Sequence, residues 1–224
     1  MIDNFYRVPW DSRALGFDAY EIRQVSKETL QYTEMIKGHF TARVHPLTDK
    51  KMLYEHGFYY CDTLIEPYCL KQDFIYFSNE KLKVCKSDNK DIEQLYHISL
   101  TSFKYDRFHR DFNIEKSIAD LRYALWLEEL HKNGNVLSLY HGKELAGFFA
   151  HVNNKVALTA LKQEYRGKDL AKCFWSLAYS MIFKMGFNEA ASSVSAANAA
   201  ILNVYARLGF KFRNPTDIYH KVNI

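Results

Sequence analysis

The sequence lacks the features that mark several large classes of protein. It has no run of about five or six like charges, and its formal charge of +4 is spread over 30 basic and 26 acidic residues, so nucleic acid is not the expected partner. No stretch approaches the roughly 18 apolar residues of a membrane-spanning helix. The start, MIDNFYRVPWDSR, has neither the charged beginning nor the apolar block of a signal peptide. We therefore expect a soluble, cytoplasmic protein without membrane insertion.

Cysteine is scarce and has no metal-binding spacing. Cys61, Cys69, Cys85 and Cys173 are too irregularly placed for zinc ligands. Each lies among apolar or aromatic neighbours, as a reduced and mostly buried thiol does. The sequence therefore predicts no metal site and favours a reducing compartment.

Aromatic side chains, in contrast, are abundant, with 16 Tyr and 16 Phe among 224 residues. The 48% of hydrophobic and 25% of charged residues are ordinary globular values. The length suits one ordinary domain plus a smaller unit, because domains cluster around roughly 100–150 residues. Since segment 71–80 is mixed and polar at both ends, we expect a small N-terminal α/β unit over 1–78 and a larger domain over 79–224.

The first unit shows alternating strand and helix signals. The predicted elements are a loop over 8–18, a strand over 19–25, a helix capped by Ser26, a short helix ended by Gly57, and an aromatic strand over 58–70. The order of helix, glycine and strand returns at 203–212. This internal similarity is weak, because the preference for glycine at the end of a helix explains it about as easily as a duplication does.

The second unit reads as mixed helix and strand. The predicted elements are a strand over 82–86, a helix capped by Asp88 or Asn89, an aromatic and basic loop over 101–113, a helix over 114–132, an antiparallel meander over 135–161, a helix over 170–185, a strand over 189–195, a helix over 198–208 and two final strands. A loop that contains Gly167 separates the meander from the next helix.

The Gly167 loop has the chemistry of a pyrophosphate site. A strand ends, a glycine turn exposes successive backbone N–H groups, and a helix N-terminus adds its positive dipole. Arg166 and Lys168 add charge, whereas Asp169 is a good N-cap that puts a negative charge at the same place. The alternative is a plain surface turn with a capped helix.

A second motif lies near the C-terminus. Asn198 and Tyr205 are seven residues apart, almost two helical turns, so they share one helix face. Gly209 and Phe210 follow the helix.

The order of elements and these two motifs resemble the GNAT acyltransferases. The resemblance implies an α/β fold with a mostly antiparallel, partly parallel central sheet, preceded here by a partial GNAT-like unit. It implies acetyl-CoA as donor, a primary amine as acceptor and no metal. The residues implied to bind the cofactor are Leu158, Ala160, Leu161, Gln163, Arg166, Gly167, Lys168, Asp169, Leu170, Ala171 and Asn198.

The resemblance also implies a role for Tyr205 as the general acid that protonates the departing thiolate. A phenol with a pKa near 10 stays protonated at neutral pH. The alternative is a buried core tyrosine. The general base stays open between a water relay and His151.

Within the superfamily, the layout is similar to the TDP-fucosamine acetyltransferases, which acetylate a nucleotide-linked 4-amino-4,6-dideoxy sugar. The shared residues include Trp10-Asp11, Leu15-Gly16-Phe17, Leu53 to Phe58, Ser102-Phe103, Arg107-Phe108 and Phe112. Phe103, Tyr105, Arg107 and Arg110 would then line the acceptor pocket. Other amine acceptors and a non-catalytic acyl-CoA-binding module remain alternatives, and exposed aromatics in the first unit are compatible with a homodimer.

Overall fold

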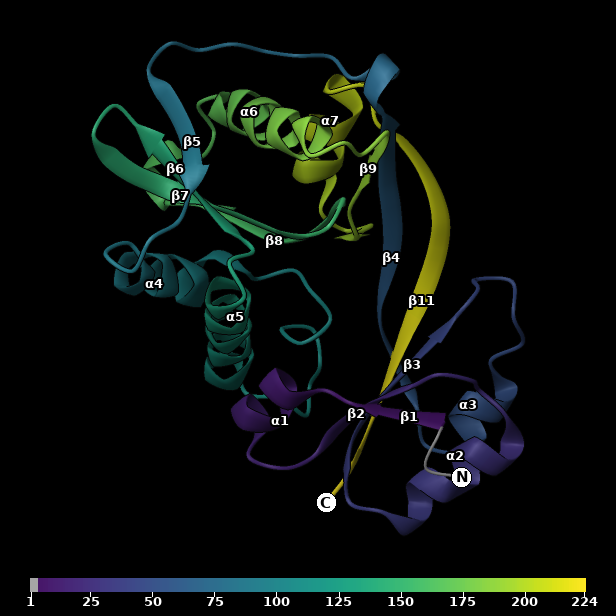
Figure 1. Ribbon diagram of the computed structural model, residues 1–224. Coiled ribbons are helices and arrows are strands. Elements are labelled where there is room, and N and C mark those ends of the chain that lie inside the picture. Colours follow the sequence, from purple (N-terminus) through teal and green to yellow (C-terminus); the bar gives the residue numbers. More distant parts are fainter. Residues whose placement is uncertain (1–3) are drawn as a thin grey trace.

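The strands of the protein form one mixed sheet in the computed structural model, which describes residues 4–224 (Figure 1). The sheet order is β1-β2-β3-β11-β4-β9-β8-β7-β6-β5, with β10 paired to β4 off this path. The strands are β1 (Phe5–Arg7), β2 (Ala19–Ile22), β3 (Gly38–Val44), β4 (Tyr59–Leu70), β5 (Leu82–Lys86), β6 (Val136–His141), β7 (Glu144–Val152), β8 (Lys155–Leu161), β9 (Glu189–Ala191), β10 (Val194–Ser195) and β11 (Lys211–Asn223). Among the strands of residues 4–224, only β2–β3 and β8–β9 pair in parallel, which confirms the predicted mixed α/β fold.

Seven α-helices accompany the sheet in the described part of the chain. They are α1 (Pro9–Leu15), α2 (Lys27–Met35), α3 (Lys51–Glu55), α4 (Ile92–Ser102), α5 (Lys116–Lys132), α6 (Leu170–Lys184) and α7 (Ala199–Arg207). Lys71–Asp73 and Gln163–Tyr165 form short 3₁₀ turns. Within residues 4–224, none of these helices combines the length and apolar character that crossing a membrane requires.

The meander β6–β8 is covered on both faces. Figure 1 shows α6 and α7 on one side of it and α4 and α5 on the other. Along β7, Phe149 packs in the cluster with α6, and its neighbour Phe148 packs in the cluster with α4 and α5. Successive side chains of a strand point to opposite faces, so a strand buried on both faces is apolar throughout its centre.

The last strand lies inside the sheet and joins β3 to β4. Asp217 to Asn223 of β11 pair with β3, and Lys211 to His220 pair with β4. The prediction of two final strands is therefore wrong, because one strand of 13 residues continues through a register shift between Arg213 and Thr216. The predicted strand 189–195 is likewise interrupted, into β9 and β10.

The predicted loop over 8–18 contains a helix instead. Pro9 occupies the first turn of α1 and Gly16 ends it at φ 77°, which are the favoured places of proline and glycine around a helix. The cap predicted for α4 at Asp88 or Asn89 is also wrong. The N-cap is Asp91, whose carboxylate accepts from Ser138 and Tyr140 and makes no side-chain cap.

Other local predictions are confirmed. Ser26 caps α2 by accepting from the Thr29 N–H at 3.2 Å, and Gly57 follows α3 at φ 77°. All four cysteines are free thiols, and Cys85 alone among them is only half-buried. The boundary near residue 78 stays a prediction, and β4, which precedes it, lies between β11 and β9.

Candidate functional site

A cavity opens where two parallel strands separate. Strands β8 and β9 pair at a single position, Lys155 with Ala191. Beyond it, residues 156–159 of β8 and residues 192–195 line opposite parts of a cavity of about 280 Å³. A gap between neighbouring strands leaves backbone N–H and C=O groups on the facing edges unpaired, and these can bind a ligand.

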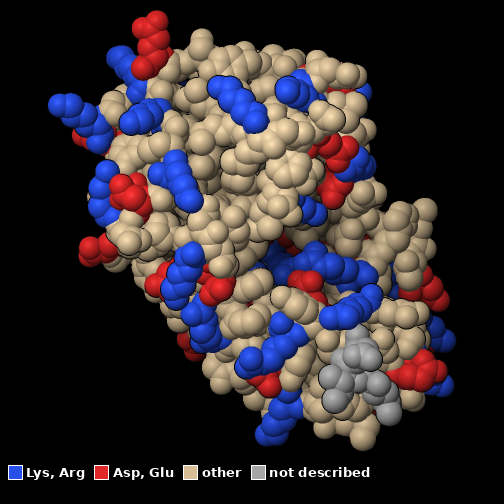
Figure 2. Space-filling view, viewed as in Figure 1, with Lys and Arg blue, Asp and Glu red and all other residues tan. Residues whose placement is uncertain are grey.

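Elements far apart in the sequence complete this cavity. Asp62 comes from β4, Phe103 and Tyr105 from the loop after α4, and Asn198 and Tyr205 from the cap and body of α7. Figure 2 shows basic side chains gathered where the surface is hollowed, between the part that carries α6 and the part that carries α1. The cavity therefore combines an apolar strand wall with charged groups at its mouth.

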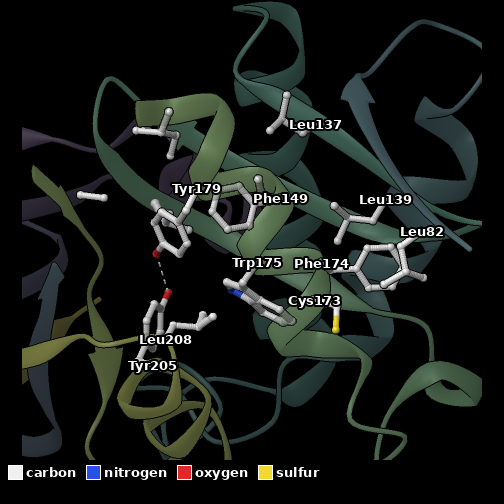
Figure 3. Close-up of a cluster of buried hydrophobic side chains, with 14 of the residues drawn as sticks. Leu82, Leu137, Leu139, Phe149, Cys173, Phe174, Trp175, Tyr179, Tyr205 and Leu208 are labelled. Atoms are coloured by element: carbon white, nitrogen blue, oxygen red, sulfur yellow. Dashed lines mark hydrogen bonds between the residues drawn. The ribbon is translucent and has the colours of Figure 1, made fainter. Parts of the chain in front are cut away.

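Tyr205 is buried, with 1% of its surface exposed, and it lines the cavity from α7. Tyr179 donates to the Tyr205 hydroxyl at 3.2 Å, and Figure 3 shows the two hydroxyls pointing toward each other. Because Tyr205 accepts this bond, its own proton is free for another acceptor. Burial raises the pKa of Tyr205, which keeps the phenol protonated at neutral pH.

Asp62 is a buried carboxylate in the same cavity, with 1% of its surface exposed. Its Oδ1 accepts from Arg110, Ser195 and the Thr63 N–H at 2.8, 2.8 and 2.9 Å, whereas its Oδ2 has no hydrogen-bond partner among the described residues. Burial raises the pKa of Asp62, while Ser195 and Arg110 act in the opposite direction. The carboxylate of this cavity-lining residue thus has one buried oxygen without a donor among the described residues.

Asp62 is a candidate functional residue that the sequence motifs do not reveal. The sequence does show a lone carboxylate in the middle of the otherwise apolar, aromatic segment FYYCDTLI. Because an acidic side chain is seldom fully buried unless it is paired, this position could have been recognised as a candidate. His151, the side chain named as a candidate base, does not line the cavity, and its Nδ1 is 2.9 Å from the Asn153 carbonyl oxygen.

Positive charge exceeds negative charge at one wall. Arg43 and Arg107 line the cavity and share a single carboxylate, Glu21, at 2.7 and 3.2 Å. Against the effect of burial, Arg107 and Arg43 lower the pKa of Glu21 to about 2. One anion cannot neutralise two guanidinium groups, so this wall is suited to a further anion.

The Gly167 loop lies beside the start of α6. Arg166 is engaged inside the protein, donating to the Leu161 carbonyl oxygen, Gln163 and Ser102 at 2.7, 3.1 and 2.6 Å. Gly167 has φ 71°, and a Cβ there would meet no atom within 4 Å. The turn therefore presents bare backbone on its outer side, while the Arg166 side chain supports the turn from within.

Asp169 departs from its predicted role as a cap. Its backbone lies at φ 60°, a conformation that favours glycine, and its side chain makes no capping hydrogen bond. The carboxylate instead pairs with Lys172 and, at 2.7 Å, with Arg207, so its charge is compensated. The first N–H groups of α6 thus lack a side-chain cap, as in helix N-termini that bind anions. These features fit a pyrophosphate.

The structure brings some of the predicted residues together and leaves others apart. Those that line the cavity are Phe103, Tyr105, Arg107, Leu158, Asn198 and Tyr205. Ala160 and Leu161 are buried in the core, and Gln163 to Ala171 form the separate loop and helix start. Arg110 bonds Asp62, and Asn198 also caps α7 by accepting from the Ile201 N–H at 3.3 Å.

Comparison with known proteins agrees with this architecture. Residues 109–221 match the family model described as an acetyltransferase (GNAT) domain. No curated protein matches the sequence.

Solved structures share the fold at low identity. A GCN5-related N-acetyltransferase from Sphaerobacter thermophilus aligns with a TM-score of 0.66 and 11% identity over 92% of this chain and 72% of its own. A GCN5-related N-acetyltransferase from Kribbella flavida aligns with a TM-score of 0.62 and 10% identity over 92% of this chain and 82% of its own. A tandem GNAT protein from the clavulanic acid biosynthesis pathway aligns with a TM-score of 0.56 and 11% identity over 91% of this chain and 75% of its own.

Proposed function

Since the chain belongs to the GNAT acetyltransferase family, we propose that it transfers an acetyl group from acetyl-CoA to the primary amine of a small anionic molecule. The observation that carries this proposal is the pairing of two groups in one cavity, the partnerless Oδ2 of Asp62 and the free hydroxyl proton of Tyr205. The first can take a proton and the second can give one.

The donor supplies an acetyl group activated as a thioester. The backbone of Gly167 and Lys168 and the uncapped start of α6 would bind its pyrophosphate, because they combine N–H donors with a helix dipole. The side chain of Asn198 and the wall around Leu158 would hold the arm that reaches into the cavity. Gln163 and Arg166 support the loop, since their side chains bond each other.

For the transfer to balance, the acceptor nitrogen must lose two protons and the leaving sulfur must gain one. Oδ2 of Asp62 takes a proton from the acceptor's ammonium group, which leaves a neutral amine able to attack. As the C–N bond forms and the C–S bond breaks, the Tyr205 hydroxyl gives its proton to the leaving sulfur. The nitrogen of the new amide loses its second proton to solvent. Tyr205 is then reprotonated from solvent and Asp62 releases its proton to solvent, which restores both groups for the next cycle. A backbone N–H on the unpaired edge of β8 would stabilise the oxyanion.

The acceptor we favour is the 4-amino group of a nucleotide-linked dideoxy sugar. Arg43 and Arg107, which share Glu21, would meet its diphosphate. The rings of Phe103 and Tyr105 would meet sugar or base, and Phe103 is already stacked on Tyr123 with centroids 4.3 Å apart. A polyamine fits this wall less well, because it would need carboxylates where guanidinium groups lie.

We also propose that residues 1–78 are a partial GNAT-like unit of the same chain. The fold match with a tandem GNAT protein over 91% of this chain supports this. The cytoplasmic location and a homodimer stay predictions.

Thiol release from acetyl-CoA, followed spectroscopically with a panel of amines, tests the proposed function. We expect release that depends on TDP-4-amino-4,6-dideoxygalactose and is weaker with the free amino sugar. Release with a non-anionic amine alone would reassign the acceptor. Calorimetric binding of acetyl-CoA without release for any amine would contradict an enzymatic role and favour an acyl-CoA-binding module.

A further inference from the structure

A second cluster of ionisable groups lies away from the cavity. His39 of β3 and His220 of β11 lie on one face of the sheet, because His39 pairs with Val222, two residues beyond His220. Their ring centroids are 4.4 Å apart. Oδ2 of Asp111, from the loop after α4, is 2.8 Å from Nδ1 of His220 and 3.7 Å from Nε2 of His39. We call these three residues the His–Asp cluster.

The cluster is closed to solvent, and within residues 4–224 no Lys or Arg forms an ion pair with its carboxylate. Its three residues expose 1%, 2% and 0% of their surfaces for His39, Asp111 and His220. Among residues 4–224, the two histidines are the sole ion-pair partners of Asp111. Tyr59 donates to both carboxylate oxygens, at 2.9 and 3.0 Å, which solvates the charge without neutralising it.

Neither imidazole is placed to carry the missing positive charge. An imidazolium has two N–H donors, and within the described residues Nε2 of His39 and Nε2 of His220 are both buried without a hydrogen-bond partner. Charging either ring would leave a buried donor unsatisfied. A buried charge is normally paired or bound to a metal ion. The buried negative charge of Asp111 is therefore suited to pairing with a bound cation.

We propose that the His–Asp cluster is a Zn²⁺ site with Oδ2 of Asp111, Nδ1 of His220 and Nε2 of His39 as ligands. The ligand atoms that the three residues offer lie within 4.8 Å of one another. The 2.8 and 3.7 Å separations lie on either side of the roughly 3.3 Å expected between ligands of a tetrahedral zinc ion. Two imidazoles and a carboxylate are ligands that zinc accepts.

The proposed ion would act on structure and not on the acetyl transfer. None of the three ligands lines the cavity. Asp111 directly follows Arg110 and is four residues after Arg107, so a metal bond to Asp111 would fasten the acceptor loop to β3 and β11. Tyr59 would orient the liganding carboxylate from outside. Binding would displace the proton that Nδ1 of His220 now shares with Asp111, so it would release a proton.

Zinc titration of the untagged, full-length chain tests the site. After dialysis against a chelator, we expect calorimetry to show one Zn²⁺ per chain and thermal unfolding to shift upward with zinc. His39→Asn and His220→Asn should each weaken binding by more than the roughly 10–100-fold that loss of an outer partner causes. His56→Asn is the matched control, because His56 already has its own carboxylate partner, Glu34, at 2.7 Å, and it should bind like the parent chain.

Cobalt substitution keeps the test decisive should the variants not fold. Co²⁺ bound to the parent chain should give visible bands of a nitrogen and oxygen site and no thiolate charge-transfer band. A thiolate band would place the ion on a cysteine and overturn the ligand set. A folded parent chain that binds neither Zn²⁺ nor Co²⁺ stoichiometrically would overturn the site itself.

Discussion

Burial acts on the pKa values of Asp62 and Tyr205 in the same direction. It raises the pKa of the Asp62 carboxyl and of the Tyr205 phenol. The shift makes Asp62 a better proton acceptor for an ammonium group, and it keeps Tyr205 in the form that can donate. A single physical cause thus prepares one residue to take a proton and the other to give one.

Tyr205→Phe removes one hydroxyl and leaves the ring in its packed position. We expect kcat to fall by roughly 100-fold or more, because the leaving sulfur loses its proton donor. Affinity for acetyl-CoA should change little, as measured by calorimetry beside steady-state kinetics. Tyr179→Phe is the comparison, since it removes the neighbouring hydroxyl but not the donor. Unchanged turnover in Tyr205→Phe would exclude it from the mechanism.

Asp62 makes the rate depend on pH. Only the carboxylate accepts a proton, so kcat/KM should rise with pH through the pKa of Asp62, which lies above the ordinary 3.8. Arg110→Gln removes a guanidinium that lowers this pKa, so the acidic limb should move to higher pH. Asp62→Asn should lower kcat/KM by roughly 100-fold or more. An acidic limb that Arg110→Gln leaves in place would assign it to another group.

Arg107→Ala tests the acceptor wall. The change removes one of the two guanidinium groups that share Glu21 and should raise KM for an anionic acceptor more than KM for acetyl-CoA. Initial-rate kinetics with each substrate varied in turn measure the two constants. The reverse pattern would assign this loop to the donor.

At the scale of elements, α1 fastens the N-terminal segment to α5. Asp11 and Arg122 form a buried ion pair at 2.6 Å, with 3% and 6% of their side chains exposed. Trp10 stacks on Trp126 with centroids 5.9 Å apart, and the Arg122 guanidinium lies 4.6 Å from the same Trp126 ring. Because α5 also forms part of the cavity wall, this contact holds that wall in place.

Asp11→Ala would leave the Arg122 charge buried and unpaired. We expect a loss of about 3–5 kcal/mol in unfolding free energy, measured by urea denaturation. Arg13→Ala is the matched control on the same helix, because Arg13 pairs with Glu129 at 3.8 Å on the surface and should cost less than about 1 kcal/mol. Equal losses in the two variants would contradict the role of the buried pair.

Local signals predicted the elements whose own residues decide them. The strands β5 and β8 and the helices α6 and α7 follow from the apolar spacing within them and, for the helices, from the glycines that follow them. Helix α1 escaped prediction because its proline and glycine resemble loop signals, and it is stabilised by α5. Asp62 escaped because its role depends on Ser195, which is 133 residues away. Contacts between segments that are distant in the chain produce no periodic pattern in the local sequence, so they could not be predicted from it.

At the scale of the whole molecule, the predicted units share their central strands. Both neighbours of β11, β3 and β4, come from residues 1–78, and β4 also pairs with β9. Ile218 and Tyr219 of β11 expose only 0% and 3% of their surfaces. Both edges of the last strand are thus paired with strands from the first part of the chain.

Residues 79–224 expressed alone should therefore not fold. Without β3 and β4, strand β11 would expose both edges and its buried side chains to water. We expect an aggregated or unfolded fragment by gel filtration and circular dichroism, and recovery of folded protein when residues 1–78 are co-expressed. A monomeric fragment with cooperative unfolding would show that the larger unit is self-sufficient.

The position of β11 between β3 and β4 also constrains folding during synthesis. The ribosome makes both neighbours long before it makes the strand that belongs between them, so the nascent chain carries two open strand edges until residues 211–223 emerge. Such edges recruit other strands. A nascent chain that pauses before residues 211–223 are available therefore has every cavity-lining side chain but an open sheet, and its two unpaired strand edges would need protection by chaperones.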